Sequence, residues 1–232
     1  MSNKNNPYFG EHGIDRHLNE KYIKDKQNGF FVECGAYDGI AISNCLYFEK
    51  KLGWKGLNIE ASKHSYKELV KNRPNCINVN YALSNENRDM EFSEVLNFNN
   101  VKPSIRVDKT IYWGIRSGFE SEPRRSWVKR NEPKSGYQSE KYIVKCYRFD
   151  TLWKELKIDK KIDLFVLDIE GHEIEALDGI LTLEDKYLPE ILCIEHHMVG
   201  VENIDKKVQD KYIKGSIEAV DVVYIKRTGN VR

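Results

Sequence analysis

Short apolar runs, separated by segments with helical spacing, constrain the fold of this chain more than any other feature of its sequence. Residues 30–34 and 56–60 have the length and composition of buried strands, and residues 76–81 alternate as a third. Helices are expected between these runs, over residues 43–52 and 62–72, because each segment begins with a serine that can cap it. The β-α-β-α-β order predicts a parallel sheet covered by helices on both faces.

The same alternation resumes in the C-terminal part of the chain. The expected elements are a strand over 142–148, a helix over 150–156, a strand over 162–168, a helix over 172–181, a strand over 191–195, a helix over 204–214 and a strand over 219–226. We therefore predict one doubly wound α/β domain over residues 1–232, with a mostly parallel sheet. Residues 1–29 precede the first strand and are expected to form an N-terminal helical cover.

Residues 97–141, between the predicted strands three and four, interrupt this pattern. They show no regular period and are too long for a simple connection, which is typical of an active-site lid or a binding insertion. Residues 102–148 hold 12 lysines and arginines against 5 aspartates and glutamates, interleaved with aromatic residues. Aromatic faces stack on sugars and arginines hold phosphate, so this basic-aromatic insertion predicts an anionic substrate such as a nucleotide sugar. Its substrate-binding candidates are Tyr112, Trp113, Arg116 and Arg124.

Composition bounds the setting in which the chain works. Its formal net charge is +1, which argues against a broad nucleic-acid-binding surface, and we expect no nucleic acid partner. No run approaches about 18 apolar residues and the first residues are polar, so neither a membrane span nor a secretory signal is expected. The five cysteines are odd in number and lack CxxC spacing, which favours the reducing cytoplasm. Whether the chain forms a homo-oligomer stays open.

The loop after the first predicted strand has the form E-x-G-x-x-x-G, from Glu33 to Gly39. Glycines at such a turn let the backbone bend sharply and approach a ligand closely. A dinucleotide site prefers G-x-G-x-x-G, because a pyrophosphate rests on amides at the start of the helix. When Gly35 is aligned with the middle glycine, the flanking glycine positions hold the acids Glu33 and Asp38. Negative charge disfavours a pyrophosphate and favours a cation such as the sulfonium of S-adenosylmethionine.

The second predicted strand ends in another acid, Glu60. It lies near the position at which an acid takes the ribose hydroxyls in nucleotide-binding α/β folds. A solvated strand end is the structural alternative for Glu60, and the glycines alone would suit an ordinary turn. Because the loop and the acid occur in the right order, together they favour a cofactor site.

Four motifs in the correct order make the chain resemble the FkbM family of S-adenosylmethionine-dependent methyltransferases. They are FFVECGAYDGIAISNCLYFEKKLGWKGLNIEAS (30–62), YALS (81–84), IDLFVLDIEGHEIEALDGI (162–180) and PEILCIEHH (189–197). The resemblance implies a Rossmann-like class I methyltransferase that acts on a hydroxyl, often of a sugar or a polyketide. The C-terminal segment looks too short for the final antiparallel strand pair that is usual in the family.

The resemblance also implies which residues bind the cofactor. The motif positions place the acids and glycines of the first loop around the methionine part, Glu60 at the ribose, and residues 82–84 near the adenine. The implied cofactor-binding residues are Glu33, Gly35, Ala36, Asp38, Gly39, Asn44, Glu60, Ala61, Ala82, Leu83, Ser84 and Asp168.

Polar residues at the ends of the later strands are the candidates for catalysis. Methyl transfer to a hydroxyl requires a base that removes the hydroxyl proton, or a metal ion that lowers the pKa of the hydroxyl. In one interpretation His172, or else His196, is the general base, with Asp168 at the same strand end and Glu170 contacting substrate. In the other, Asp168, Glu195 and His196 bind a divalent cation such as Mg²⁺. In a purely structural interpretation, Glu170 and Glu173 cap the helix that follows this strand, where negative charge is favourable near the positive helix end.

The leading hypothesis is therefore an O-methyltransferase in carbohydrate biosynthesis, which acts on a sugar hydroxyl of a nucleotide-linked or phosphorylated glycan precursor. A methyltransferase of another small-molecule hydroxyl, polyketide-like, is the nearest alternative. A non-catalytic relative that serves as a binding scaffold is a second, although the loop keeps its acid and both glycines. A nicotinamide-dependent oxidoreductase is a third, and the missing G-x-G-x-x-G counts against it.

Overall fold

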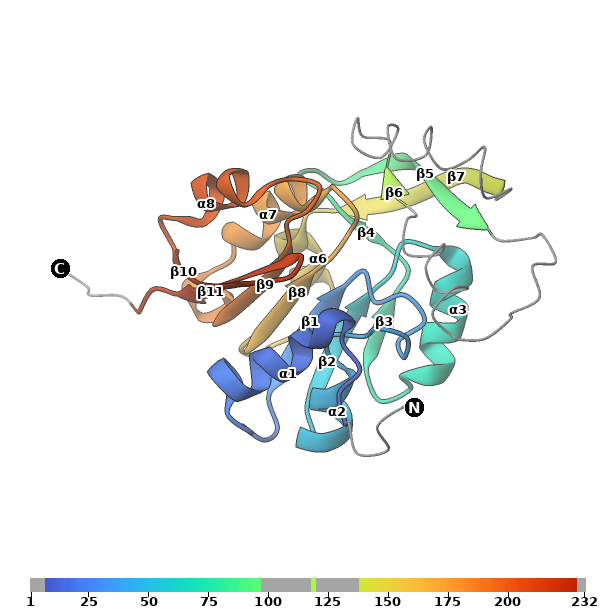
Figure 1. The fold of residues 1–232 in the computed structure, drawn as a ribbon. Coiled ribbons are helices and arrows are strands. Elements are labelled where there is room, and N and C mark those ends of the chain that lie inside the picture. The colour runs from blue at the N-terminus through green and yellow to red at the C-terminus, as the bar shows by residue number, and fades with distance from the viewer. Residues whose placement is uncertain (1–6, 97–117, 120–137, 229–232) are drawn as a thin grey trace.

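A central sheet organises the computed structural model, which describes residues 7–96, 118–119 and 138–228 (Figure 1). Its seven strands lie in the order β10-β11-β9-β8-β1-β2-β3, and only β11 runs antiparallel to its neighbours. The prediction of a doubly wound, mostly parallel sheet is confirmed. The strands are β1 (Phe30–Cys34), β2 (Lys55–Ile59), β3 (Ile77–Val79), β8 (Leu164–Leu167), β9 (Ile191–Glu195), β10 (Tyr212–Glu218) and β11 (Asp221–Lys226).

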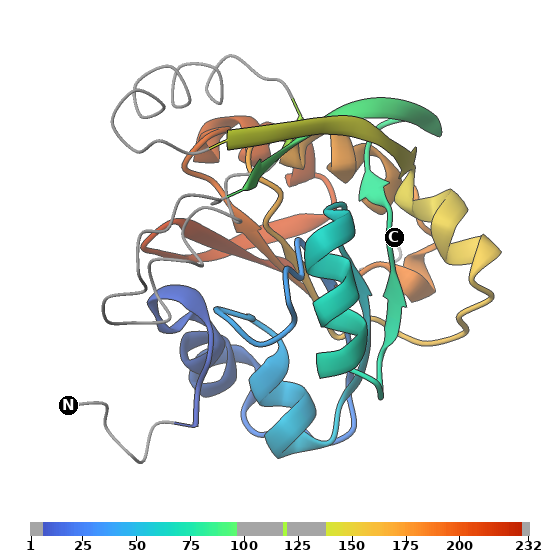
Figure 2. The same cartoon turned by 90° about the vertical axis from the view of Figure 1, so that its right-hand side faces the viewer.

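Helices cover both faces of this sheet, because alternate residues of each strand point to opposite sides. In β1, Phe30 and Val32 pack with α6, α7 and α8, whereas Phe31 packs on the other face with α1 and α2 (Figures 1 and 2). The helices are α1 (Ile14–Leu18), α2 (Leu46–Leu52), α3 (Lys63–Asn72), α6 (Phe149–Glu155), α7 (Glu173–Leu181) and α8 (Val201–Val208), with short 3₁₀ turns at Glu11–Gly13 and Asp185–Tyr187. Within the described ranges, no helix has the length and apolar character needed to cross a membrane.

The C-terminal strand pair differs from the expectation. The predicted helix over 204–214 ends at Val208, and the chain then forms the antiparallel pair β10 and β11, which the sequence seemed too short to contain. Pairing decides this outcome, since β11 inserts between β10 and β9 and buries Val222, Val223 and Tyr224. Tyr212, at the start of β10, is buried as well and donates its hydroxyl hydrogen to the carbonyl of Pro189.

A second, smaller sheet lies beyond one end of the central sheet, above α3 in both views (Figures 1 and 2). Its strands, in the order β4-β7-β5-β6, are β4 (Ala82–Leu83), β7 (Gln138–Tyr147), β5 (Arg88–Leu96) and β6 (Gly118–Phe119). The sequence pattern predicted a strand only over 142–148, because β5 carries many charged residues and lacks a clean apolar alternation. The predicted insertion leaves from this β5–β7 hairpin, and its residues 97–117 and 120–137 lie outside the described part of the chain.

The segment before β1 packs on the α2 face of the sheet. Ile14 and Leu18 of α1 join the same apolar cluster as Phe48 of α2, and the Tyr8 ring stacks on Tyr47 with 4.2 Å between the ring centroids. A π-helical turn at Asn19–Ile23 follows α1 directly. These contacts place the N-terminal residues over the helix that follows the first loop.

A buried arginine joins this loop to two helices. Arg73 follows α3, is 0% exposed, and donates from Nε to the carboxylate of Glu49 on α2. Its Nη1 donates to the carbonyl oxygen of Gly39 and the hydroxyl of Ser43, each at 3.1 Å, and lies 3.4 Å from Oε2 of Glu33. A fully buried guanidinium is tolerated because carboxylates and loop oxygens replace its water.

We expect Arg73→Met to lower the free energy of unfolding by about 3–5 kcal/mol, because it leaves two buried carboxylates without their counter-ion. Urea unfolding followed by tryptophan fluorescence measures this loss. Lys71→Met, an exposed position on the same helix that pairs only with the exposed Glu68, is the matched control and should change stability little. Equal losses in the two variants would contradict a special role for Arg73.

Candidate functional site

A pocket lies at the carboxyl ends of β1, β2 and β8, where the order of the strands reverses. Phe92 of β5 and Gly118–Phe119 of β6 close it from the second sheet. Among the residues predicted from the sequence, those that line this pocket are Glu33, Gly35, Ala36, Asn44, Glu60, Ala61, Ala82, Leu83, Asp168 and Glu170.

Two loop residues that we expected at the cofactor shape the loop instead of lining the pocket. The Asp38 carboxylate accepts hydrogen bonds from the backbone N–H groups of Ile40 and Ala41, both at 2.8 Å. Gly39 adopts a φ of +78°, and a Cβ there would lie 2.6 Å from the Arg73 side chain. Neither Asp38 nor Gly39 is among the residues that line the pocket, and their contact with a cofactor stays a prediction.

Gly35 is required by the close approach of two strands. Its φ is +86°, and an added Cβ would lie 1.8 Å from the carbonyl oxygen of Asp168. The ends of β1 and β8 are held at this distance by the Asp168 N–H, which donates to the carbonyl of Cys34 at 3.1 Å. The sequence pattern suggested that this glycine makes room for a ligand, and the structure shows that it also makes room for the neighbouring strand.

The Glu33 carboxylate is buried at the pocket wall and is held by the start of α2. It accepts hydrogen bonds from the hydroxyl of Ser43 at 2.9 Å and from the N–H groups of Asn44 and Cys45 at 2.7 and 3.1 Å. Burial raises the pKa of Glu33, while the Arg73 charge and these hydrogen bonds oppose the rise. Glu33 therefore orients the loop, whether or not it also touches a ligand.

Glu60 follows β2 and presents its carboxylate to the pocket. Its Oε2 accepts from the N–H of Tyr37 and its Oε1 from the N–H of Ser62, both at 2.7 Å. Burial raises the pKa of Glu60 to about 7, and the charge of nearby Glu94 adds to the rise. Each oxygen keeps a lone pair that can accept a further hydrogen bond from a ligand hydroxyl.

Asn44 lines the pocket, and its side-chain oxygen lies toward Gly10 of the N-terminal segment. The residue is 5% exposed, and its Oδ1 has no hydrogen-bond partner within the described residues. A buried amide oxygen without a partner costs free energy, so a hydrogen-bond donor would stabilise it.

Carboxylates gather at the ends of β8 and β9. Burial raises the pKa of Asp168 well above its usual range, and the charges of Glu195, Asp221 and Glu173 add to it. Burial likewise raises the pKa of Glu195 to about 9 and that of Asp221 to about 7. Like charges in a small volume resist ionisation, so this end of the sheet favours a cation.

His172 lies behind the pocket lining. Its Nε2 is 3.0 Å from the Ser84 hydroxyl, its Nδ1 is 3.6 Å from Glu175, and its ring packs on Phe119 at 4.8 Å between centroids. Burial lowers the pKa of His172, which favours the neutral imidazole. His172 and Ser84 thus support Phe119, and neither lines the pocket itself.

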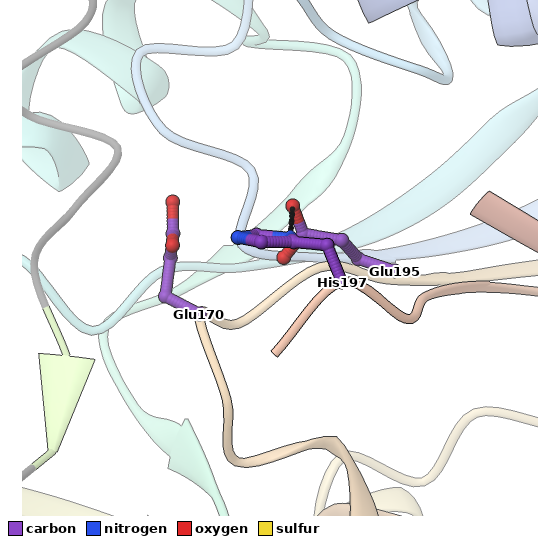
Figure 3. Close-up of side chains that lie close together, drawn as sticks. All are labelled: Glu170, Glu195 and His197. Atoms are coloured by element: carbon purple, nitrogen blue, oxygen red, sulfur yellow. Dashed lines mark ion pairs between the residues drawn. The ribbon is translucent and has the colours of Figure 1, made fainter. Parts of the chain in front are cut away.

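The histidine beside the strand-end carboxylates is His197, whereas the sequence pointed to His196. Figure 3 shows Glu170, Glu195 and His197 converging, with one ligand atom from each lying within 4.8 Å of the others. Nδ1 of His197 is 2.8 Å from Oε1 of Glu195, and Nε2 of His196 is buried without a partner within the described residues. Side chains alternate along an extended chain, so His197, two residues after Glu195, points to the same side as Glu195, whereas His196 points to the opposite side.

Several pocket residues were not among the predicted site residues, although Tyr37 and Tyr81 lie within quoted motifs. Tyr37 and Ile42 belong to the first loop, Tyr81 precedes β4, and Phe92 and Phe119 come from the second sheet. The predicted substrate-binding residues Tyr112, Trp113, Arg116 and Arg124 lie outside the described residues.

A left-handed conformation costs a non-glycine residue about 1–2 kcal/mol. We expect Gly35→Ala to destabilise the protein by more than this, because the new Cβ also collides with the Asp168 carbonyl. Gly13→Ala is the matched control, since Gly13 has a φ of +75° but nothing lies within 4 Å of its added Cβ. Thermal unfolding of both variants separates the clash from the backbone strain. Similar losses at the two positions would refute the strand-approach explanation.

Comparison with known proteins identifies the family. The family model of the methyltransferase FkbM domain matches residues 33–214. No curated protein sequence matches the chain. Similar solved structures include the fibrillarin pre-rRNA processing protein of Methanococcus jannaschii (11% identity, 89% of this chain and 70% of that chain covered, TM-score 0.43). A TehB-like SAM-dependent methyltransferase of Corynebacterium glutamicum is 9% identical, with 92% of this chain and 87% of that chain covered and a TM-score of 0.43. The N-terminal domain of human METTL16 in complex with SAH is 9% identical, with 92% of this chain and 67% of that chain covered and a TM-score of 0.40.

The family match spans both the first loop and the acidic segment after β8, which together build the pocket. The chain belongs to the FkbM family of S-adenosylmethionine-dependent methyltransferases and has their Rossmann-like class I fold.

Proposed function

We propose that this methyltransferase transfers the methyl group to a hydroxyl of a small, sugar-like acceptor that carries phosphate or a nucleotide. The observation that carries the cofactor part of the proposal is the set of carboxyl groups that line the pocket, whereas the phosphate on the acceptor is proposed from the basic insertion in the sequence. Glu33, Glu60, Asp168 and Glu170 line the pocket, and the described lining contains no lysine, arginine or histidine.

This lining fits S-adenosylmethionine and disfavours a nicotinamide dinucleotide. The Glu60 carboxylate lines the pocket and can accept hydrogen bonds from ribose hydroxyls. Ala61, Ala82 and Leu83 give an apolar surface for a flat base. A pyrophosphate among these carboxylates would be repelled, because the described lining offers it no positive side chain.

When bound, S-adenosylmethionine supplies an electrophilic methyl carbon. Its methyl group would pass to the acceptor oxygen as the carbon–sulfur bond breaks, which would leave S-adenosylhomocysteine. The hydroxyl proton must pass to a base, and Asp168 and Glu170 are the carboxylates that line the pocket after β8. His172 packs on Phe119 and is not among the residues that line the pocket, and its role as the general base stays a prediction from the sequence.

The aromatic residues of the second sheet favour a ring-shaped acceptor. Phe92 and Phe119 meet edge to face, with centroids 5.8 Å apart, and both line the pocket. Aromatic faces pack against the apolar faces of sugars while hydroxyls reach polar groups at the edge. The phosphate part of the acceptor would contact Arg116 and Arg124 of the insertion, which remains a prediction from the sequence.

The five cysteines are all free thiols, which suits the proposed reducing, cytoplasmic setting. Carbohydrate biosynthesis is the process in which such an acceptor would be modified.

We expect the affinity for S-adenosylmethionine to rise with pH through about 7, by up to tenfold per unit below it, because only ionised Glu60 accepts both ribose hydroxyls well. Below this pH the buried carboxyl is protonated and must lose its proton on binding. Calorimetry at pH 6 and pH 8 measures the change. Glu60→Gln should weaken binding and flatten the profile, whereas Glu202→Gln on exposed α8 should preserve it; an unchanged profile in Glu60→Gln would rule out the ribose assignment.

The function itself is tested by calorimetry with S-adenosylmethionine and with NAD, followed by a screen of acceptors. We expect binding of the first and not of the second, and a methylated product with nucleotide sugars detected by mass spectrometry. Polyketide-like alcohols and RNA oligonucleotides are the comparison acceptors. Cofactor binding without methylated sugar, but with methylated alcohol or RNA, would overturn the acceptor class; absence of cofactor binding would indicate a scaffold.

A further inference from the structure

We propose that Glu170, Glu195 and His197 form a binding site for a divalent transition-metal cation at the edge of the pocket (Figure 3). Two segments bring the ligands together. Glu170 lies in the loop after β8, Glu195 ends β9, and His197 follows two residues later. The set differs from the Asp168, Glu195 and His196 set predicted from the sequence, and it contains the histidine that the structure turns toward the carboxylates.

The geometry of the three side chains suits one shared ion. One ligand atom from each lies within 4.8 Å of the others, which is compatible with a common centre about 2.0–2.5 Å from each after small side-chain adjustments. In Figure 3 a ring nitrogen of His197 points toward Glu170, while the dashed line joins the imidazole to Glu195. The imidazole thus already lies between the two carboxylates.

An unpartnered oxygen at the centre of this group gives independent support. The Glu195 side chain is 8% exposed, and its Oε2 has no hydrogen-bond partner within the described residues. A buried carboxylate oxygen without a donor is costly, and metal coordination removes that cost. His197 is the partner of Oε1, and the Asp168 side chain lies within hydrogen-bonding reach of the same carboxyl group. Oε2 receives no other described donor and can coordinate an ion.

The type of ligand favours particular ions. Two carboxylates with one imidazole suit Mn²⁺, Fe²⁺ or Zn²⁺, whereas Mg²⁺ prefers oxygen ligands throughout. Three protein ligands leave coordination positions open for solvent or for an acceptor oxygen.

The position of Glu170 connects the ion to the methyl-transfer pocket. Glu170 lines that pocket, so an ion that it binds would face the acceptor and polarise the reacting hydroxyl, which releases its proton to solvent or to Asp168. This role rests on the proposed function, whereas binding of the ion does not.

Electron paramagnetic resonance of Mn²⁺ added to the metal-free full-length chain tests the site. We expect the protein to bind one Mn²⁺ and to show nitrogen modulation from a coordinated imidazole, with Mg²⁺ competing poorly. Glu170→Gln and His197→Gln should each weaken Mn²⁺ binding by about tenfold or more, and His197→Gln should also abolish the nitrogen modulation. His197 is exposed whereas Glu170 is 9% exposed, so circular dichroism is used to verify that both variants fold.

His17→Gln is the matched control. His17 makes a similar imidazole–carboxylate pair with Glu218, at 3.3 Å, but this pair is not part of a three-ligand group within the described residues. The His17→Gln variant should bind Mn²⁺ as the wild-type chain does. No Mn²⁺ binding by the wild-type chain, or equal binding by all three variants, would overturn the proposed site.

Calorimetry with S-adenosylmethionine on the same metal-free samples keeps the two proposals distinguishable. Cofactor binding without Mn²⁺ binding would overturn the metal site and leave the proposed function standing. Mn²⁺ binding without cofactor binding would overturn the proposed function and leave the metal site standing. If both bind, methyl transfer that is lost in EDTA and restored by Mn²⁺ supports the catalytic role of the ion, and transfer that is indifferent to EDTA overturns that role.

Discussion

The buried carboxylate of Glu33 joins strand β1, the loop that follows it and two helices. It receives the Ser43 hydroxyl and two N–H groups at the start of α2, where the helix dipole favours negative charge. Arg73, from the end of α3, lies against the same carboxylate and also holds Glu49 and the carbonyl of Gly39. The wall of the pocket depends on this arrangement, because these bonds hold the loop against β1 and α2.

The charge of the pocket follows from the parallel sheet. Parallel strands end at the same edge, so acids placed at the ends of β1, β2, β8 and β9 accumulate there. Near Glu33 the positive charge of Arg73 balances them, whereas near Asp168 and Glu195 the described residues supply only histidines. This imbalance suits a cationic cofactor and, beside it, a metal ion. The second sheet adds the aromatic wall that separates this site from solvent.

The sequence predicted the central sheet well and the second sheet poorly. The run 191–195 coincides with β9, and 30–34 with β1, because both strands are buried on both faces and consist almost wholly of apolar residues. Strand β5 escaped prediction because Arg88, Asp89 and Glu91 give it a polar surface, and its pairing with β7 spans a long insertion. The predicted helix over 204–214 overlaps the first residues of β10 (212–218). These residues form a strand because they pair with β11, and not because of a local preference.

The sequence by itself determined the order of the elements, the acids and glycines of the first loop, and the family to which they belong. These features are local or lie in short motifs, so a single chain displays them. Only the tertiary structure decided which side chains meet. It showed that Gly35 must be glycine because the Asp168 carbonyl approaches it, and that Arg73 balances Glu33. It also showed that His197, and not His196, joins Glu170 and Glu195. The physical reason is that these neighbours come from segments far apart in the chain, and their contacts arise only when the strands align.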